Sequence, residues 1–236
     1  MMQRWSPDAI RFMADASEYG TYNKDLAAIL KPYMATQGHV CDAGCGLGYL
    51  AQKLAGYCAE VTAIDRSPAV IEAMKARQLP HNLRVFCEDI FTIDAQFDSM
   101  VFCYFGRTDE ILRVSQKLCT GNVLIVKREC ADHSFSIGKI AHRKHTIEDT
   151  LLKLQELKIP YEQRKICLEM GQPFRTMEDA MTFFRLYNKS EQEVELSAVE
   201  KRLIKTGQVD FPLYLPNRRA MELIVFSAND LPKGVL

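Results

Sequence analysis

The residues best suited to chemistry lie at 39–48, where the chain reads His-Val-Cys-Asp-Ala-Gly-Cys-Gly-Leu-Gly. A short apolar run ends in the carboxylate of Asp42, and three glycines follow at alternate positions, Gly44, Gly46 and Gly48. A helical pattern begins directly after them. A strand, a glycine turn and a helix let backbone N–H groups approach a ligand closely, because glycine has no Cβ in the way. The segment therefore predicts a ligand site at the end of a strand.

The spacing of this turn distinguishes between ligands. A dinucleotide fingerprint needs a third small residue at position 49, where this chain has the bulky Tyr49. The carboxylate of Asp42 would repel a pyrophosphate but suits a positively charged group. S-adenosylmethionine carries an ammonium and a sulfonium, so it fits this turn better than NAD does. The turn thus argues against a dehydrogenase.

Two further acids end apolar runs that are typical of strands. The run 61–65 ends in Asp65, and the run 83–87 is followed by Glu88 and Asp89. Ligands of parallel sheets bind at the carboxyl ends of the strands, where Asp42 also falls, and an acid at the second tip can accept both hydroxyls of a ribose.

Together these segments resemble the class I S-adenosylmethionine-dependent methyltransferases, whose first motif is an acid, any residue and then Gly-x-Gly-x-Gly. The resemblance covers residues 38–130 well and the rest loosely. It implies an α/β fold with a Rossmann-like seven-stranded, mostly parallel sheet, helices on both faces and an antiparallel last strand. We expect a helical cap between strands six and seven. S-adenosylmethionine is the implied cofactor, with S-adenosylhomocysteine as the product.

The resemblance also implies which residues bind the cofactor. Asp42 and the turn would hold its methionine part and Asp65 its ribose, while Asp89 would accept the adenine amine beside Ile90. Arg66 would cover the adenine or be solvated, and Tyr19 and Tyr22 would fold over the cofactor or cover the domain edge. The expected cofactor-binding residues are Tyr19, Asp42, Gly44, Cys45, Gly46, Leu47, Gly48, Asp65, Arg66, Asp89, Ile90 and Tyr104.

Catalytic groups are less evident. The tip 103–107 would face the transferred methyl, and it lacks the Asn/Asp-Pro-Pro-Tyr/Phe motif of enzymes that methylate nucleobase amines. Tyr104 and His133 are the candidates for a catalytic role, His133 as a general base. Cys130, His133, His142 and His145 cluster in sequence, but their spacing matches no zinc finger, and we expect no metal.

The remaining pattern predicts a single domain over 1–236, with N-terminal helices at 1–37, a core at 38–170 and 220–236, and a cap at 171–219. Ser6 and Asn23 are expected to cap the first two helices, the first running to about Ala16. The expected inner face of the helix after the capping box at Thr146 is Leu151, Leu152, Leu154 and Leu157. In the cap, Thr176 and Ser197 are expected to begin helices, and Gly207 to stop the second. Strands are expected at 39–42, 61–65, 83–87, 98–104, 122–127, 162–170 and 221–226, and core helices at 48–56, 68–78 and 108–118.

Composition limits the class of protein. Lys and Arg number 30, as do Asp and Glu, which argues against broad nucleic-acid or membrane binding. No apolar run is long enough for a membrane span, and the N-terminus lacks a signal core, so we expect a cytoplasmic protein. The eight cysteines are expected to be free thiols, buried in the strand-like runs at Cys41, Cys87 and Cys103.

The sequence therefore favours a methyltransferase that acts on a small-molecule acceptor by in-line displacement. Two alternatives stay open, an RNA or protein methyltransferase and a non-catalytic, cofactor-binding regulatory subunit. Oligomerisation is left open as well. A broad basic groove would favour RNA, whereas a plugged pocket would favour the regulatory subunit.

Overall fold

The computed structural model describes residues 5–129, 131–132, 134–138, 141–142 and 146–232. They form two compact units. The larger one, called the sheet unit below, comprises Asn23–Glu129, His145–Ile166 and Ala220–Leu236. The other, called the small unit, comprises Met1–Tyr22, Cys130–Lys144 and Cys167–Arg219.

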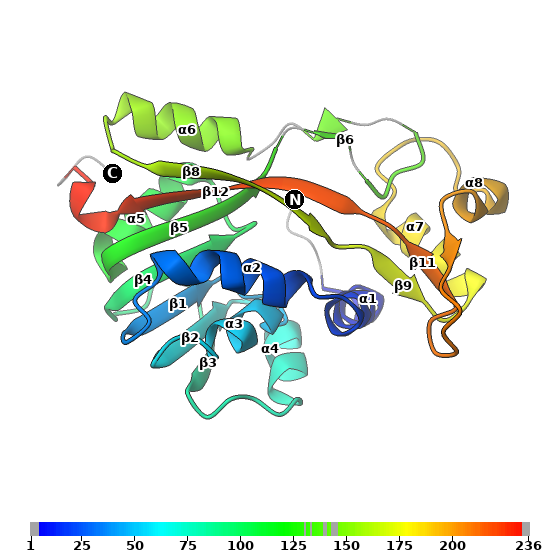
Figure 1. The fold of residues 1–236 in the computed structure, drawn as a ribbon, viewed down its shortest axis with the longest axis horizontal. Helices are drawn as coiled ribbons and strands as arrows, with labels where there is room; N and C mark the ends of the chain where they lie inside the picture. The colour runs from blue at the N-terminus through cyan, green and yellow to red at the C-terminus, as the bar shows by residue number, and fades with distance from the viewer. Residues whose placement is uncertain (1–4, 130, 133, 139–140, 143–145, 233–236) are drawn as a thin grey trace. The chain divides into compact units, whose positions relative to one another are not determined.

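A seven-stranded sheet is the centre of the sheet unit (Figure 1). Its strand order is β3-β2-β1-β4-β5-β12-β8. The first five of these strands pair in parallel, and β12 runs antiparallel to β5. The predicted mostly parallel sheet with an antiparallel last strand is thus confirmed. The strands are β1 His39–Ala43, β2 Glu60–Asp65, β3 Leu83–Cys87, β4 Phe97–Cys103, β5 Cys119–Arg128, β8 Glu162–Glu169 and β12 Arg218–Ser227.

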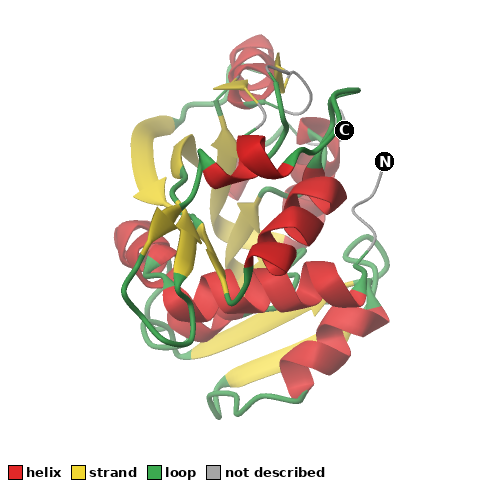
Figure 2. Ribbon diagram, turned by 90° about the vertical axis from the view of Figure 1, so that its right-hand side faces the viewer, coloured by secondary structure: helices red, strands yellow, loops and turns green. Residues whose placement is uncertain are grey.

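Helices flank this sheet (Figure 2), as the alternation of strand and helix patterns predicts. At the start of α6, the predicted capping box is confirmed, because the Thr146 N–H donates to Asp149 Oδ2 at 3.2 Å. The helices and 3-10 turns are α2 Tyr22–Leu30, η1 Lys31–Tyr33, α3 Tyr49–Leu54, α4 Pro68–Lys75, α5 Thr108–Leu118, α6 Ile147–Glu156 and η2 Ala228–Asp230.

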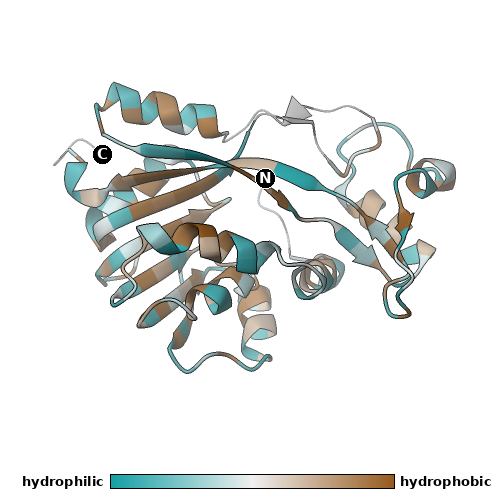
Figure 3. Ribbon diagram, in the orientation of Figure 1, coloured by the Kyte–Doolittle hydropathy of each residue, from teal (hydrophilic) through white to brown (hydrophobic). Residues whose placement is uncertain are grey.

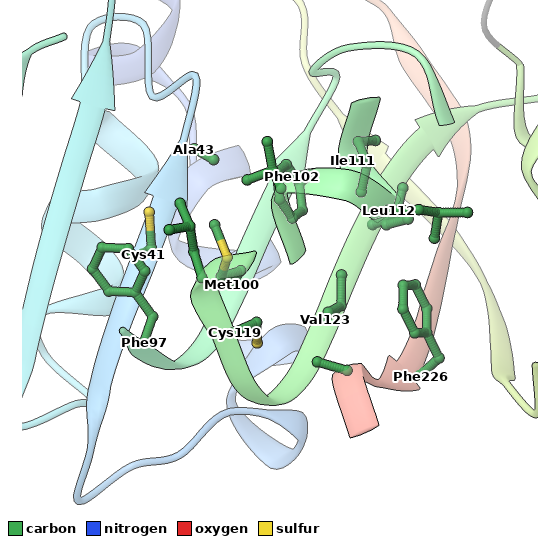
Figure 4. Packing of buried hydrophobic residues seen from close by; sticks show 14 of the residues in the cluster. Cys41, Ala43, Phe97, Met100, Phe102, Ile111, Leu112, Cys119, Val123 and Phe226 are labelled. Atoms are coloured by element: carbon green, nitrogen blue, oxygen red, sulfur yellow. The ribbon is translucent and has the colours of Figure 1, made fainter. Parts of the chain in front are cut away.

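A core cluster lies between the sheet and helices α5 and α6 (Figure 4). Met100 and Phe102 of β4 pack there with Ile111 and Leu112 of α5. The strands β1, β4 and β5 are largely apolar in Figure 3, as strands covered on both faces must be. On α6 the predicted inner face was partly wrong. Leu154 is buried, but Leu152 is exposed, and Ile147 takes the inner position instead.

The small unit contains two sheets and three helices among the described residues. Phe12, Phe174, Phe183 and Phe184 form its apolar centre. Segment 171–219 is not purely helical as predicted, because it also carries a three-stranded sheet, β10-β11-β9. The elements are α1 Pro7–Tyr19, β6 Ala131–Asp132, β7 Ala141–His142, β9 Gln172–Phe174, α7 Met177–Tyr187, α8 Leu196–Glu200, β10 Ile204–Lys205 and β11 Leu213–Leu215.

The ends of the N-terminal helices and of the helices in segment 171–219 differ from prediction in several places. Ser6 caps α1 as expected, accepting from Ala9 N–H at 3.2 Å, but the helix continues to Tyr19. Asn23 lies inside α2, which begins one residue earlier. In the segment 171–219, Thr176 caps α7 as expected. Ser197 lies inside α8, and Gly207 occupies a left-handed turn at φ +75° after that helix has ended at Glu200.

The cysteine prediction is confirmed in part. The seven described cysteines form no disulfide with one another, and Cys41 is buried. Cys87 is exposed, because β3 is the edge strand of the sheet, and Cys103 is only partly buried. Within the described residues, no helix is long and apolar enough to cross a membrane.

Candidate cofactor site

The glycine turn after β1 has the backbone that the spacing predicts. Gly44, Gly46 and Gly48 all have positive φ, at +72°, +53° and +69°, a region that glycine adopts without a Cβ penalty. The N–H groups of Gly44 and Cys45 both donate to the Ile64 carbonyl, at 2.8 and 3.0 Å. The turn is therefore fixed to the neighbouring strand β2 before α3 begins.

Two of these glycines are also required by close packing. A Cβ on Gly44 would lie 2.9 Å from Cε2 and 3.1 Å from Cγ of Phe105, and closer still to Cδ2. A Cβ on Gly48 would overlap the thioether of Met74. These separations are below the 3.5–4.0 Å optimum for carbon contacts. The turn thus packs against the tip of β4 on one side and α4 on the other.

Asp42 lies at the end of β1 with its side chain 2% exposed. Its Oδ2 atom has no hydrogen-bond partner among the described residues. Burial, followed by repulsion from Asp65, raises the pKa of Asp42 to about 7, although a hydrogen bond from the Ala51 backbone opposes this. An unpaired buried acceptor costs about 1–3 kcal/mol. A cationic ligand group beside this carboxylate would offset that cost, so the residue fits the charge of a sulfonium or ammonium ligand.

Asp65 ends β2, and its carboxylate points toward the turn. Oδ2 accepts from the Gly46 N–H and Oδ1 from the Ser67 N–H, each at 2.9 Å. An ionised carboxylate offers about four acceptor sites, so two ribose hydroxyls can still be accommodated. The contact with Gly46 was not foreseen, and it couples the second predicted acid directly to the glycine turn.

Asp89 follows β3 and stabilises its own turn. Its Oδ1 accepts from the Phe91 N–H at 3.1 Å, and its carbonyl accepts from the Thr92 hydroxyl at 2.9 Å. Ile90, the expected neighbour of the adenine, packs into the core cluster below α5. Arg66 lies exposed after β2. Because β1, β2 and β3 are parallel, Asp42, Asp65 and Asp89 lie at the same end of the sheet, where the carboxyl ends of these strands meet.

The side chains at the other positions of the turn point in different directions. Leu47 is buried, and its carbonyl accepts from the guanidinium of Arg77, which also stacks on the Tyr49 ring at 3.8 Å. Cys45 is partly buried, and burial, followed by the charges of Asp42 and Asp65, raises the pKa of its thiol well above the ordinary value. The role of Arg77 had no sequence signal, because it lies at the end of α4, about 30 residues beyond the turn.

Tyr104 follows β4 with a positive φ of +55°, which is uncommon for a residue with a side chain. Its ring is 36% exposed, the Arg128 guanidinium lies 5.1 Å from the ring centre, and its hydroxyl donates to Met221 Sδ at 3.3 Å. Since β4 runs parallel to its neighbour β1, and β5 runs parallel to β4, Tyr104 and Arg128 lie at the same end of the sheet as the glycine turn.

The remaining predicted residues lie elsewhere. His133, the other catalytic candidate, falls outside the described residues, as do Cys130 and His145. Tyr19 belongs to the small unit, where it packs against Phe211 and Tyr214, with ring centres 5.6 and 5.3 Å away. Its contact with a cofactor stays a prediction. Within the described part of the chain, no group of three or more His, Cys, Asp or Glu residues could hold a metal ion.

Comparison with known proteins agrees with this geometry. The family model "Methyltransferase domain" matches residues 36–184. The ubiquinone biosynthesis O-methyltransferase of Coxiella burnetii is 41% identical over 69 residues, which cover 28% of this chain and only 30% of that enzyme.

Two solved structures show the same fold. The YcgJ protein of Bacillus subtilis is 13% identical with a TM-score of 0.54, covering 88% of this chain and 98% of its own. The protein BH2331 of Bacillus halodurans is 15% identical with a TM-score of 0.55, covering 89% and 99%.

Proposed function

The chain belongs to the methyltransferase domain family, and from that premise we propose that it transfers the methyl group of S-adenosylmethionine to a small-molecule acceptor. The observation that carries the proposal is the buried, unpaired Oδ2 of Asp42 next to a turn of left-handed glycines. An anionic ligand would add to the repulsion that Asp42 already meets from Asp65, whereas a cationic one relieves it.

The proposed roles follow the order of the strand tips. Asp42 and Gly44–Gly48, with Cys45 and Leu47, hold the methionine part. Asp65 accepts the ribose hydroxyls, and Asp89 with Ile90 binds the adenine, whose outer face Arg66 covers. Tyr104 lies at the tip that faces the methyl, and Tyr19 is a further proposed cofactor-binding residue.

The cofactor supplies a methyl group already activated by a sulfonium. The protein must therefore align the acceptor with that methyl and exclude water, which requires positioning rather than covalent chemistry. A general base is needed only where the acceptor nucleophile carries a proton, and His133 and Tyr104 are the proposed candidates.

A small hydroxyl-bearing acceptor is supported by the balanced charge of the chain, 30 basic and 30 acidic residues, and by the name of the Coxiella burnetii relative. The chain spans less than a third of that relative's length in the match, so the acceptor stays a proposal. RNA or protein methylation and a regulatory subunit without turnover are the alternatives.

Calorimetric titration with S-adenosylhomocysteine tests cofactor binding. Asp65→Ala removes charge-assisted hydrogen bonds and is expected to weaken binding by about 1–3 kcal/mol. Gly46→Val fills the space of the turn and is expected to abolish binding. The exposed Asp94 in the same unit provides the matched control, and Asp94→Ala should bind as the parent does. Parent affinity in Asp65→Ala would refute the ribose assignment.

A methylation assay with pools of metabolites as acceptors then identifies the class of acceptor. A product heavier by one CH2, seen by mass spectrometry only with added S-adenosylmethionine, would support a small-molecule methyltransferase. Labelled methyl groups recovered only in RNA or protein would favour the first alternative. Tight binding of S-adenosylhomocysteine without any methylated product would favour the regulatory subunit.

A further inference from the structure

Lys127 is a buried cation without a carboxylate partner. It is the next-to-last residue of β5, and its side chain is 2% exposed. Its Nζ donates to Thr108 Oγ1 at 3.2 Å and to Thr150 Oγ1 at 3.1 Å. Among the described residues, no Asp or Glu oxygen lies within ion-pair distance, 4.0 Å, of this ammonium.

Acidic groups nevertheless face Lys127 from each element packed against it. Asp109 and Glu110 lie in the first turn of α5, and Asp149 lies in the first turn of α6. On β12, Glu222 is directly opposite in register, and its carboxylate accepts from Gln163 of β8. Burial lowers the pKa of Lys127 to about 8, while Asp149, Asp109 and Glu110 act to raise it.

The two threonine partners place this ammonium at a junction of three elements. Thr108 is the first residue of α5, directly after the loop 104–107, and Thr150 lies in α6. The two hydroxyls are also 3.0 Å from each other. A hydrophobic side chain at position 127 would therefore leave neither hydroxyl unpaired, and replacing a buried charge in this way is often neutral or stabilising.

The loop 104–107 is held at several points close to the cofactor turn. At its start, the Tyr104 N–H donates to the Val126 carbonyl at 2.9 Å. In its middle, the Phe105 ring fills the space beside Gly44 and lies 5.7 Å from Phe102. Its end is joined to Lys127 through Thr108. Any shift of Thr108 must therefore reach the ring that abuts the glycine turn.

We propose that Lys127 is a positioning residue, whose ammonium fixes the loop 104–107 through Thr108 and so keeps Phe105 against the cofactor turn. The effect on cofactor affinity rests on the proposed function, whereas the effect on the loop does not. Lys127 does not touch the cofactor turn itself, and its buried charge is retained for geometry at a cost in stability.

The central variant is Lys127→Met, which keeps the length of the side chain and removes the charge. We expect its melting temperature to equal or exceed that of the parent. We expect its affinity for S-adenosylhomocysteine to fall about 3- to 30-fold, the range of coupling through packed contacts. As the pH rises from 7 to 9, the parent should lose affinity relative to Lys127→Met, because only the parent loses the ammonium.

Thr150 provides a matched pair on the other side of the ammonium. Thr150→Val removes the hydroxyl at nearly constant volume and should weaken binding in the same direction as Lys127→Met. Thr150→Ser keeps the hydroxyl and should bind as the parent does. If Lys127→Met does not fold, these two threonine variants still test whether the Lys127 ammonium positions the loop 104–107.

Backbone NMR measures the loop without any ligand. In the parent, the amide shifts of Phe105, Gly106 and Thr108 should change with a midpoint near pH 8, and in Lys127→Met that step should be absent. Loop amides without such a step in the parent would overturn the proposal, as would parent affinity in both Lys127→Met and Thr150→Val. If the parent binds no S-adenosylhomocysteine, the proposed function fails, and the loop amides alone decide the role of Lys127.

Discussion

The contact between Gly44 and Phe105 gives a prediction whose size follows from the structure. Gly44→Ala places a Cβ at φ +72°, which costs about 1–2 kcal/mol for an L-residue. The same Cβ meets three carbons of the Phe105 ring inside van der Waals distance. Phe105 is packed against the core cluster, so the ring must move against its neighbours, and such overpacking costs about 1–3 kcal/mol. The free energy of unfolding should therefore fall by about 2–5 kcal/mol.

Gly106→Ala is the matched control in the same unit. Its φ is +57°, and the nearest atom to an added Cβ, Glu110 Oε2, would lie at an ordinary 3.4 Å. The free energy of unfolding of Gly106→Ala should fall only by the cost of the left-handed backbone, about 1–2 kcal/mol. Urea unfolding followed by circular dichroism measures the free energy of unfolding of both variants. Combining Phe105→Ala with Gly44→Ala should recover the part of the loss that comes from the clash between the new Cβ and the ring. Equal losses in Gly44→Ala and Gly106→Ala, with no coupling to Phe105, would refute the packing of the loop on the turn.

Two pH predictions follow from buried charges. Burial raises the pKa of Asp42 from 3.8 to about 7, so the folded state binds the extra proton and stability should fall as the pH rises through this window. Asp42→Asn should remove about 3 kcal/mol of that fall between pH 5 and 8, measured by urea unfolding at these two pH values, and a parent-like slope would contradict it. Burial lowers the pKa of Lys127 from 10.5 to about 8, so the unfolded state holds the proton longer and stability should rise between these values. Thermal melts at pH 8 and 10 should show a rise of about 2 kcal/mol in the parent and none in Lys127→Met.

The sequence was most informative where local chemistry decides the structure. Asp42, the alternate glycines and the apolar run before them predicted β1, the turn and the start of α3 at Tyr49. The seven core strands were found close to their observed ranges, and the inner strands β1, β4 and β5 are apolar because both of their faces are covered. Thr146 with Asp149, and Ser6 before Pro7, are local hydrogen-bonding signals, and both caps are confirmed.

Features set by distant contacts were not predictable from the sequence. Leu152 continues the apolar pattern of α6, but its face is exposed because the sheet is reached by Ile147 and Leu154. The strands β9, β10 and β11 have two or three residues each, too short for a period to emerge. The bond from Gly46 to Asp65 joins residues 19 apart, and the contact of Lys127 with Thr150 joins residues 23 apart.

The two acids at the tips of β1 and β2 explain why the site favours a cation. Asp42 and Asp65 lie at the ends of adjacent parallel strands, and the charge of Asp65 makes ionisation of Asp42 less favourable. Asp65 is stabilised by two backbone N–H groups, whereas Asp42 keeps an oxygen with no donor among the described residues. A neutral donor could pair with that oxygen but would not offset the repulsion from Asp65, and an anion would worsen it. A positively charged ligand lowers the pKa of Asp42, so its binding near pH 7 must release a proton, and calorimetry in buffers of different ionisation enthalpy measures that release directly.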